Sequence, residues 1–158
     1  ATHPYQSTWF QWVFDLRPMW YYVGTVGNVF HTISCFSNPL LTWAGVPAIL
    51  FTTYRALFKK DTVAWYIVVG YFSGLLPWII YVHRIVFAYH FYPTSLFTII
   101  AIVYCIYHLK ERKYHFIVPV YLALYLGFFI LFLPVTTGFG TTIQFAKFLA
   151  WLPRWYFG

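Results

Sequence analysis

Carboxylates are the first residues to examine, because general acid and base chemistry is carried mostly by carboxyl and imidazole groups. The chain has only three acidic residues, Asp15, Asp61 and Glu111. Asp61 and Glu111 lie in short basic clusters, where we expect them to offset neighbouring Lys and Arg. Asp15 lies two residues from Arg17, and we interpret it as a local partner of that arginine. A lone acid without a second reactive group does not define a catalytic centre, so the sequence predicts no catalytic residue in this chain.

A second group of reactive side chains lies in the stretch VHRIVFAYHFYP, residues 82–93. Arg84 stands at the expected membrane edge, where it either extends to the lipid headgroups or binds a lipid phosphate with its planar fork of donors. His90 lies about a turn and a half deeper, where an ionisable side chain is costly unless it is buried and partnered. His83 and His90 are seven residues apart and would share one face of a continuous helix, but metal-binding histidines on one helix are usually three or four apart, and no third ligand is evident, so we expect no metal site.

The N-terminal stretch combines aromatic and polar side chains just outside the apolar part of the chain, in His3, Tyr5, Ser7 and Trp9. Aromatic faces with a few hydrogen-bond donors suit a sugar or a peptide, and they equally suit the lipid headgroup region. Composition and spacing here leave both interpretations open.

The elements that position these residues follow from the composition. Of the 158 residues, 61% are hydrophobic, 26% are aromatic and only 8% are charged. Soluble domains average about 25% charged residues, so a water-soluble domain is excluded. Disorder is excluded too, because disordered chains combine low hydrophobicity with high charge. The composition is typical of a polytopic membrane protein with one small domain.

The net charge of +7 is concentrated in short clusters between long apolar stretches, around Arg55 and residues 59–61 and again at 110–113. Basic clusters at the ends of apolar stretches are typical of cytoplasmic loops. We therefore expect a membrane protein and no nucleic-acid partner. Cys35 and Cys105 lie far apart in the sequence, and their spacing predicts neither a disulfide framework nor a metal site.

Four stretches are long and apolar enough to cross a bilayer, which takes about 20 residues. They are residues 38–58, 62–82, 86–109 and 115–134. Their connections are short, so we expect consecutive spans to be antiparallel neighbours. Asn38 and Pro39 are expected to begin the first span, as a cap and a first-turn proline.

The positive-inside tendency places the two basic loops in the cytoplasm, and both chain ends on the outer face. The flanks 5–22 and 143–157 are rich in Trp and Tyr, so we expect interfacial helices there, and residues 22–37 could form a re-entrant or lateral segment. The predicted fold is all-α: a four-helix transmembrane bundle at 38–134, an outer aromatic segment at 1–37 and an outer C-terminal helix at 135–158. The start at Ala1, without an initiator Met or a signal sequence, indicates a longer chain.

Four motifs together resemble a known family. HPYQSTWFQWVFDLRPMWYY resembles the entrance to the C-terminal membrane region of the protein O-mannosyltransferases, where an H-P-Y-x-S-x-W…W…R-P-x-W-Y-Y pattern recurs. SNPLLTWAG, RIVFAYHFYP and LAWLPRWYFG resemble further elements of that region. The motifs occur in the family's order over nearly the whole chain, and the short loops resemble the bacterial branch.

The resemblance implies an activity as well as a fold. Enzymes of this family transfer mannose, with inversion, from dolichyl- or polyprenyl-phosphate-mannose to Ser or Thr of proteins on the outer or lumenal face. Their catalytic acidic pair lies in an N-terminal external loop, so this chain resembles the C-terminal four-helix part without its base. The implied partners are membrane lipid, polyprenyl-phosphate-mannose, the acceptor protein and the N-terminal part of the same enzyme, with no cofactor. The implied location is the bacterial cell membrane or, alternatively, the endoplasmic reticulum membrane.

The resemblance matches motif positions without assigning a role to each, and we expect some of them to bind the donor lipid phosphate and sugar. The matched motif positions selected for that role are Arg84, His90, Tyr89, His3, Tyr5, Trp9 and Arg17. The chain departs from the family pattern at Ser37, where Gly is usual, at Thr42, where Trp is common, and at Asp15, where an apolar residue is usual.

Two other functions stay open. The chain could be a non-catalytic membrane scaffold, since it lacks an adequate set of acids and bases. It could also be a small four-helix transporter, but coupled carriers usually place an acid inside a span, and the four predicted spans contain neither Asp nor Glu. We therefore rank transport last.

Overall fold

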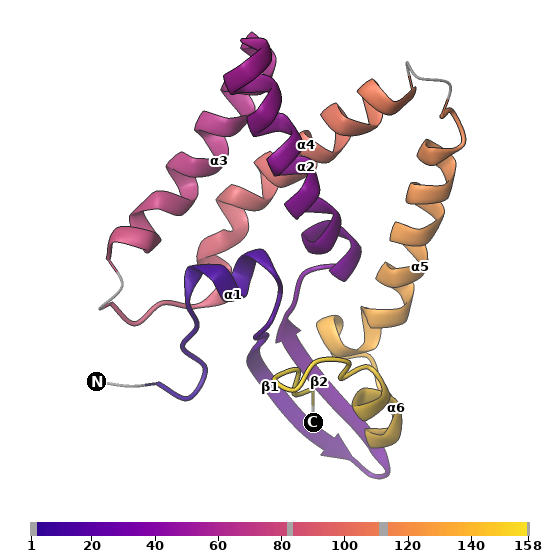
Figure 1. Cartoon of the computed structure of the whole chain (residues 1–158). Helices are drawn as coiled ribbons and strands as arrows, with labels where there is room; N and C mark the ends of the chain where they lie inside the picture. Colours follow the sequence, from indigo (N-terminus) through magenta and orange to yellow (C-terminus); the bar gives the residue numbers. More distant parts are fainter. Residues whose placement is uncertain (1–2, 82–83, 111–113, 158) are drawn as a thin grey trace.

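The computed structural model describes residues 3–81, 84–110 and 114–157. The described chain is mostly helical, with one β-hairpin near its N-terminus (Figure 1). Its elements in chain order are α1 (Trp9–Val13), β1 (Met19–Val26), β2 (Val29–Cys35), α2 (Pro39–Lys59), α3 (Thr62–Ile80), the 3-10 helix η1 (Ala88–Phe91), α4 (Tyr92–Lys110), α5 (Ile117–Thr137) and α6 (Ile143–Phe148).

Three stretches of helix are long and apolar enough to cross a membrane: Thr62–Ile80, Ala88–Leu109 and Ile117–Thr137. Each begins and ends close to one of the predicted spans, because a long apolar run is a strong local signal. The predicted first span corresponds to α2, whose 21 residues include Arg55 and Lys59. This helix is as long as α5, but it does not meet the same criterion of length and hydropathy.

The sequence places the start of α2 as expected. The Asn38 side chain accepts a hydrogen bond from the Leu40 amide at 3.0 Å, and Pro39 occupies the first turn. The first amides of a helix lack partners within the helix. Asn38 supplies a partner for one of them, and Pro39 has no amide hydrogen that needs one. Span four ends later than predicted, because α5 continues through Pro134 and stops at Gly138, which adopts a left-handed conformation with φ 79°.

Helices α2, α3 and α4 pack together into the main core. Small residues allow this close approach. A Cβ atom at Gly45 of α2 would collide with Thr98 of α4, and one at Gly70 of α3 would collide with Phe97 of α4. Lipid tails are as apolar as these side chains, so close packing, rather than burial from water, holds the three helices together.

A polar cluster joins the tight turn that connects α2 and α3 to the neighbouring helix α4. Asp61 accepts hydrogen bonds from Arg55 at 2.9 Å and from the Tyr104 hydroxyl at 2.6 Å. Its second oxygen accepts from the Ala64 amide at 3.1 Å and so caps α3. The expectation that Asp61 offsets a neighbouring cation is confirmed by its ion pair with Arg55. Glu111, for which the same was expected, lies outside the described residues.

The prediction of an all-α fold is wrong for residues 19–35, which form an antiparallel hairpin. Strand β1 consists largely of aromatic and β-branched residues, which favour strands. Gly27 and Asn28 form the two-residue turn, and Gly27 takes a φ of 60°, which glycine adopts at little cost. Aromatic residues near a membrane also favour an interfacial helix or a lateral segment, which is why the hairpin differs from the expectation for residues 5–37.

A second core joins the hairpin, the end of α5 and the C-terminal segment. Phe30 of β2 forms a backbone bridge with Thr141, and His31 bonds the Gly138 carbonyl at 2.9 Å. Trp155 and Phe157 are almost fully buried there. The expected C-terminal interfacial helix is represented only by the six residues of α6, and the rest of the segment folds back as irregular chain.

Helix α5 is packed differently from the other long helices. Most of its contacts are with β2, and it meets α2 and α4 over few residues. One tether is the Asn38 side-chain amide, which donates to the Tyr125 carbonyl at 3.0 Å. Little of α5 is buried within the chain.

Figure 1 shows the hairpin and α6 at one end of the molecule, which we call the hairpin end, with α1 between the hairpin and the long helices. The α2–α3 turn, the end of α4 and the start of α5 lie at the other end. This arrangement agrees with the expected alternation of the chain between two faces. Which face is cytoplasmic stays a prediction from the charges.

Replacing Asp61 by Asn should lower the thermal stability of the protein in detergent by about 1–2 kcal/mol, because it removes a charge-assisted hydrogen-bond network. These hydrogen bonds hold the pKa of Asp61 well below its usual range. A depressed pKa means that the stabilisation is present above about pH 4 and is lost as the pH falls through the lowered pKa. Thermal unfolding at pH 7, with Lys59→Gln as a control for an exposed neighbouring charge, checks this. Equal loss of stability in both variants would contradict it.

Candidate functional site

Two adjoining hollows open at the hairpin end, and Arg17 and Arg154 line both of them. We call the first, of about 410 Å³, the Arg84 hollow. Its other lining residues come from the N-terminal segment, α1, α3 and the α3–α4 connection. They are Gln6, Ser7, Thr8, Trp9, Phe10, Gln11, Trp78, Arg84 and Val86. The second, of about 470 Å³, we call the Trp20 hollow; it is lined otherwise by Pro4, Tyr5, Pro18, Trp20 and Tyr156.

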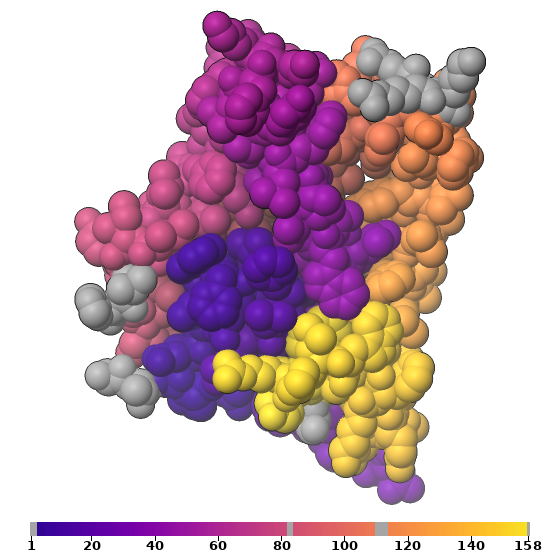
Figure 2. All heavy atoms as spheres, viewed as in Figure 1, coloured from indigo at the N-terminus to yellow at the C-terminus, as the bar shows by residue number. Residues whose placement is uncertain are grey.

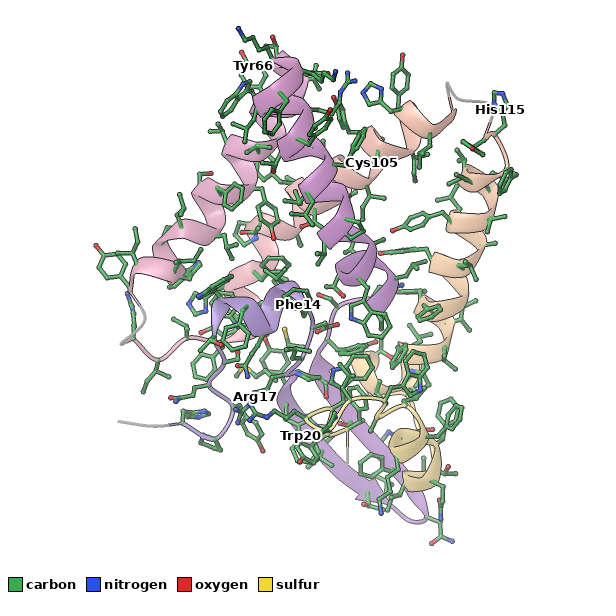
Figure 3. The ribbon with its side chains drawn as sticks, viewed as in Figure 1. Phe14, Arg17, Trp20, Tyr66, Cys105 and His115 are labelled. Atoms are coloured by element: carbon green, nitrogen blue, oxygen red, sulfur yellow. The ribbon has the colours of Figure 1, made fainter. Side chains whose placement is uncertain are left out.

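Each arginine of this site is positioned by a different part of the chain. Arg17 follows α1 and donates a hydrogen bond from Nη2 to the Pro4 carbonyl, which holds it against the N-terminal segment. Figure 3 shows Arg17 close to Trp20, where the hairpin begins. Arg84 follows α3, and its backbone amide donates to the Tyr81 carbonyl at 3.2 Å. The site therefore depends on the tertiary fold rather than on one motif.

Arg154 is positioned by its neighbour Trp155. The Trp155 indole stacks on Trp43 with ring centroids 6.0 Å apart, and its Nε1 donates to the Asp15 carbonyl at 2.6 Å. Because that ring is buried, the adjacent Arg154 is directed outward and is exposed. Figure 2 shows the C-terminal segment, in yellow, against the N-terminal segment, in indigo.

Positive charge at this site is not compensated by carboxylates. The ion pair found among the described residues joins Arg55 and Asp61 at the opposite end. Arg17, Arg84 and Arg154 therefore line two adjoining hollows without an acidic partner in the described parts of the chain. Guanidinium groups match the oxygens of phosphate and carboxylate. The arrangement suits a ligand that carries negative charge.

The expected pairing of Asp15 with Arg17 is wrong. Asp15 is buried, its backbone has a φ of 53°, and this turn carries the carboxyl group inward. Oδ2 is buried without a hydrogen-bond partner in the described structure. Burial raises the pKa of Asp15 well above its usual range, although a hydrogen bond from the Ser37 backbone opposes this. Asp15 is thus a buried acid whose charged form is disfavoured by its surroundings, and its side chain lines neither hollow.

A small cavity behind Arg17 brings Asp15 together with Cys35 and Tyr92. The Cys35 Sγ and the Tyr92 hydroxyl are 3.0 Å apart and share a hydrogen bond. Burial raises the pKa of the Cys35 thiol. These groups form a buried polar cluster that shares Arg17 with the two hollows.

His90 belongs to an aromatic cluster next to the Arg84 hollow. Its ring lies 4.2 Å from Trp78, 4.4 Å from Tyr89 and 6.0 Å from Trp12, measured between centroids. Its Nδ1 contacts the backbone of Phe87. His90 is half-buried and partnered, and the residues that line the two hollows do not include it.

The other residues selected from the sequence divide into two groups. Trp9 lines the Arg84 hollow, and Tyr5 lines the Trp20 hollow with its ring 6.1 Å from Trp20. His3 and Tyr89 line neither; the His3 ring packs on Phe87 at 5.1 Å, and Tyr89 stacks on Phe87 at 5.7 Å. These two side chains therefore pack on Phe87, outside both hollows.

Sequence reasoning missed Arg154 as a site residue, although the motif LAWLPRWYFG was noted. A signal was present in that motif, where Arg154 stands among aromatic residues. As for metals, within residues 3–81, 84–110 and 114–157 no group of three His, Cys, Asp or Glu side chains is placed to hold an ion.

Replacing Asp15 by Asn should make stability less dependent on pH. Because its folded pKa is raised, Asp15 contributes stability that is complete below about pH 4 and is lost as the pH rises through the raised pKa. Asn tolerates the positive φ and does not ionise, so the stability of the variant should fall less than that of the parent as the pH rises from about 4 to about 8. Thermal unfolding between pH 4 and pH 8 checks this. A variant whose stability falls with pH as steeply as that of the parent would contradict a raised pKa of Asp15.

Comparisons with known proteins give the same identification along the whole chain. The model of the C-terminal four-transmembrane region of protein O-mannosyltransferases matches residues 1–155. A polyprenol-phosphate-mannose–protein mannosyltransferase of Corynebacterium glutamicum is 27% identical over 98% of this chain and 32% of its own length. Enzymes of the same name from Mycobacterium tuberculosis and Mycolicibacterium smegmatis are each 25% identical over 97% of this chain, and over 32% and 33% of their own lengths.

The chain spans about a third of the length of these relatives. The apolar helices and the family match together make it an integral membrane protein. Because the match extends from residue 1 to residue 155, this chain belongs to the family of C-terminal four-transmembrane regions of protein O-mannosyltransferases.

Proposed function

We propose that this chain is the C-terminal membrane part of a polyprenyl-phosphate-mannose–protein mannosyltransferase, and that its Arg84 hollow binds the phosphate of the lipid donor. The observation that carries the proposal is the set of three arginines, Arg17, Arg84 and Arg154, that line this hollow without a carboxylate partner in the described chain. A phosphodiester supplies the negative charge that this arrangement lacks.

The lipid part of the donor would lie against α3. Arg84 follows the end of this helix, and Leu76 and Ile80 in its last turns are exposed apolar side chains. Trp78 of the same helix lines the Arg84 hollow. Trp78 lies on a different face of α3 from Leu76 and Ile80, so a polyprenyl tail against those two residues would turn around the end of α3 for its phosphate to reach the arginines.

The arginines would act on the leaving group. In mannosyl transfer the Ser or Thr oxygen forms a bond to the anomeric carbon, and the bond from that carbon to the phosphate oxygen breaks. The polyprenyl phosphate leaves with the electron pair, and the hydroxyl proton passes to a carboxylate base supplied from outside this chain. Fixed cations at the phosphate stabilise the charge that grows there in the transition state.

The proposal includes α2 as a fourth membrane span and a cytoplasmic location for the α2–α3 turn. The helix has the length that a bilayer requires, and it packs against α3 and α4. Its Arg55 is close to the end of the helix and is paired with Asp61. Lys59 and Lys60 follow directly, and basic residues at the end of a span favour the cytoplasmic side. The hairpin end would then face outward.

Replacing Arg84 by Gln in the complete protein should lower the rate of mannosyl transfer roughly 100-fold, the loss typical of one group that stabilises transition-state charge. Arg84→Lys should recover part of the rate, because Lys keeps the charge but not the planar fork. Initial rates of transfer from polyprenyl-phosphate-mannose to a Thr-containing peptide, measured in membranes, check both.

Lys147→Gln provides the matched control, since Lys147 is an exposed cation of α6 that lines neither hollow. It should leave the rate unchanged. An Arg84→Gln protein that is present in the membrane in normal amounts and transfers mannose at the parental rate would overturn the role of the Arg84 hollow.

A further inference from the structure

The Trp20 hollow differs from its neighbour in which parts of the chain build it. Its walls are the N-terminal segment, the start of the hairpin and the C-terminal segment, through Tyr5, Trp20 and Tyr156. The Arg84 hollow, in contrast, includes Trp78 of α3. The helices of the proposed spans thus contribute to the Arg84 hollow, whereas the Trp20 hollow is built beyond them. A ligand of the Trp20 hollow would approach from water rather than from the bilayer.

The chemistry of the Trp20 hollow suits an extended, acidic peptide. Arg17 and Arg154 supply positive charge, and three aromatic rings with two prolines supply apolar surface. The Trp20 Nε1 is a buried donor without a hydrogen-bond partner in the described structure. A carboxylate pairs with guanidinium groups, and the aromatic and proline surface suits the apolar parts of a peptide.

An open strand edge lies next to this hollow. The described sheet has only two strands, β1 and β2, so the second edge of β1 has no strand beside it. Trp20 belongs to β1, and Pro18 precedes that strand. Extended peptides can add to such an edge through their backbone. A peptide that enters along β1 would pass the Trp20 hollow and reach Arg17 and Arg154 on the wall shared with the Arg84 hollow.

We propose that the Trp20 hollow binds the acceptor polypeptide, and that Arg154 selects acceptors with an acidic side chain close to the Ser or Thr that receives mannose. This inference rests on the proposed function, because it takes the Arg84 hollow as the donor site. It adds a preference among acceptors, which arises from charge complementarity at the shared wall.

The test uses the complete protein in membranes and a set of peptides that differ at one position. Each peptide carries one Thr, and Asp, Asn or Lys is placed in turn at each position up to three residues from it. For the parent protein we expect kcat/KM for the best Asp peptide to exceed that of its Asn counterpart roughly tenfold, the scale of one close charge pair. The ratio between two peptides cancels any change in donor binding, since both use the same donor site.

Arg154→Gln should reduce the Asp-to-Asn ratio to about one. Arg154→Glu should invert the preference, so that the Lys peptide becomes the best acceptor, and a gain of this kind cannot come from misfolding. Trp20→Ala, which removes an aromatic wall of the hollow, should raise the KM for the acceptor peptides with little effect on the KM for the donor.

Arg84→Gln separates the two proposals. It should lower transfer to every peptide and leave the Asp-to-Asn ratio unchanged. Normal transfer by this variant would overturn the donor site. An Asp-to-Asn ratio near one in the parent, or a ratio that Arg154→Gln does not change, would overturn the acceptor preference alone. Inhibition by glycerol phosphate that is competitive with the acceptor, combined with no preference among peptides, would assign the hollow to a lipid headgroup and also overturn it.

Discussion

The hydrogen bond from the Trp155 indole to the Asp15 carbonyl is the constraint on which the hairpin end depends. It joins positions 140 residues apart at a distance of 2.6 Å, inside a buried aromatic cluster. A buried indole N–H needs such a partner, so this hydrogen bond fixes the position of the C-terminal segment. In that position Arg154 lines both hollows together with Arg17. Two hollows exist at this end because both chain ends meet there.

Charge is distributed unequally between the two ends of the molecule. At one end, Asp61 is paired with Arg55 and Tyr104, and the network is satisfied within the chain. At the hairpin end the acid is buried and its pKa is raised, whereas the arginines are left without carboxylate partners among the described residues. The first arrangement holds helices together. The second leaves positive charge exposed at the hollows, where the proposed donor site lies.

The sequence was sufficient to predict the long helices, because apolar runs such as residues 62–80 carry a strong signal over many residues. The hairpin could have been predicted from Gly27 and Asn28 between β-branched and aromatic residues, but aromatic residues near a membrane also indicate an interfacial segment. Arg17 and Arg84 were selected from motifs. The position of Arg154 and the burial of Asp15 depend on the Trp155 contact and on the backbone turn at Asp15, and such long-range contacts leave no local pattern.

Helix α5 rests on the hairpin and touches the other long helices only sparsely, with apolar clefts of about 360 and 340 Å³ on either side of their junction. Within the described chain, α5 is therefore held mainly at its hairpin end, and its remaining apolar surface is left for lipid or for another part of the complete enzyme to cover.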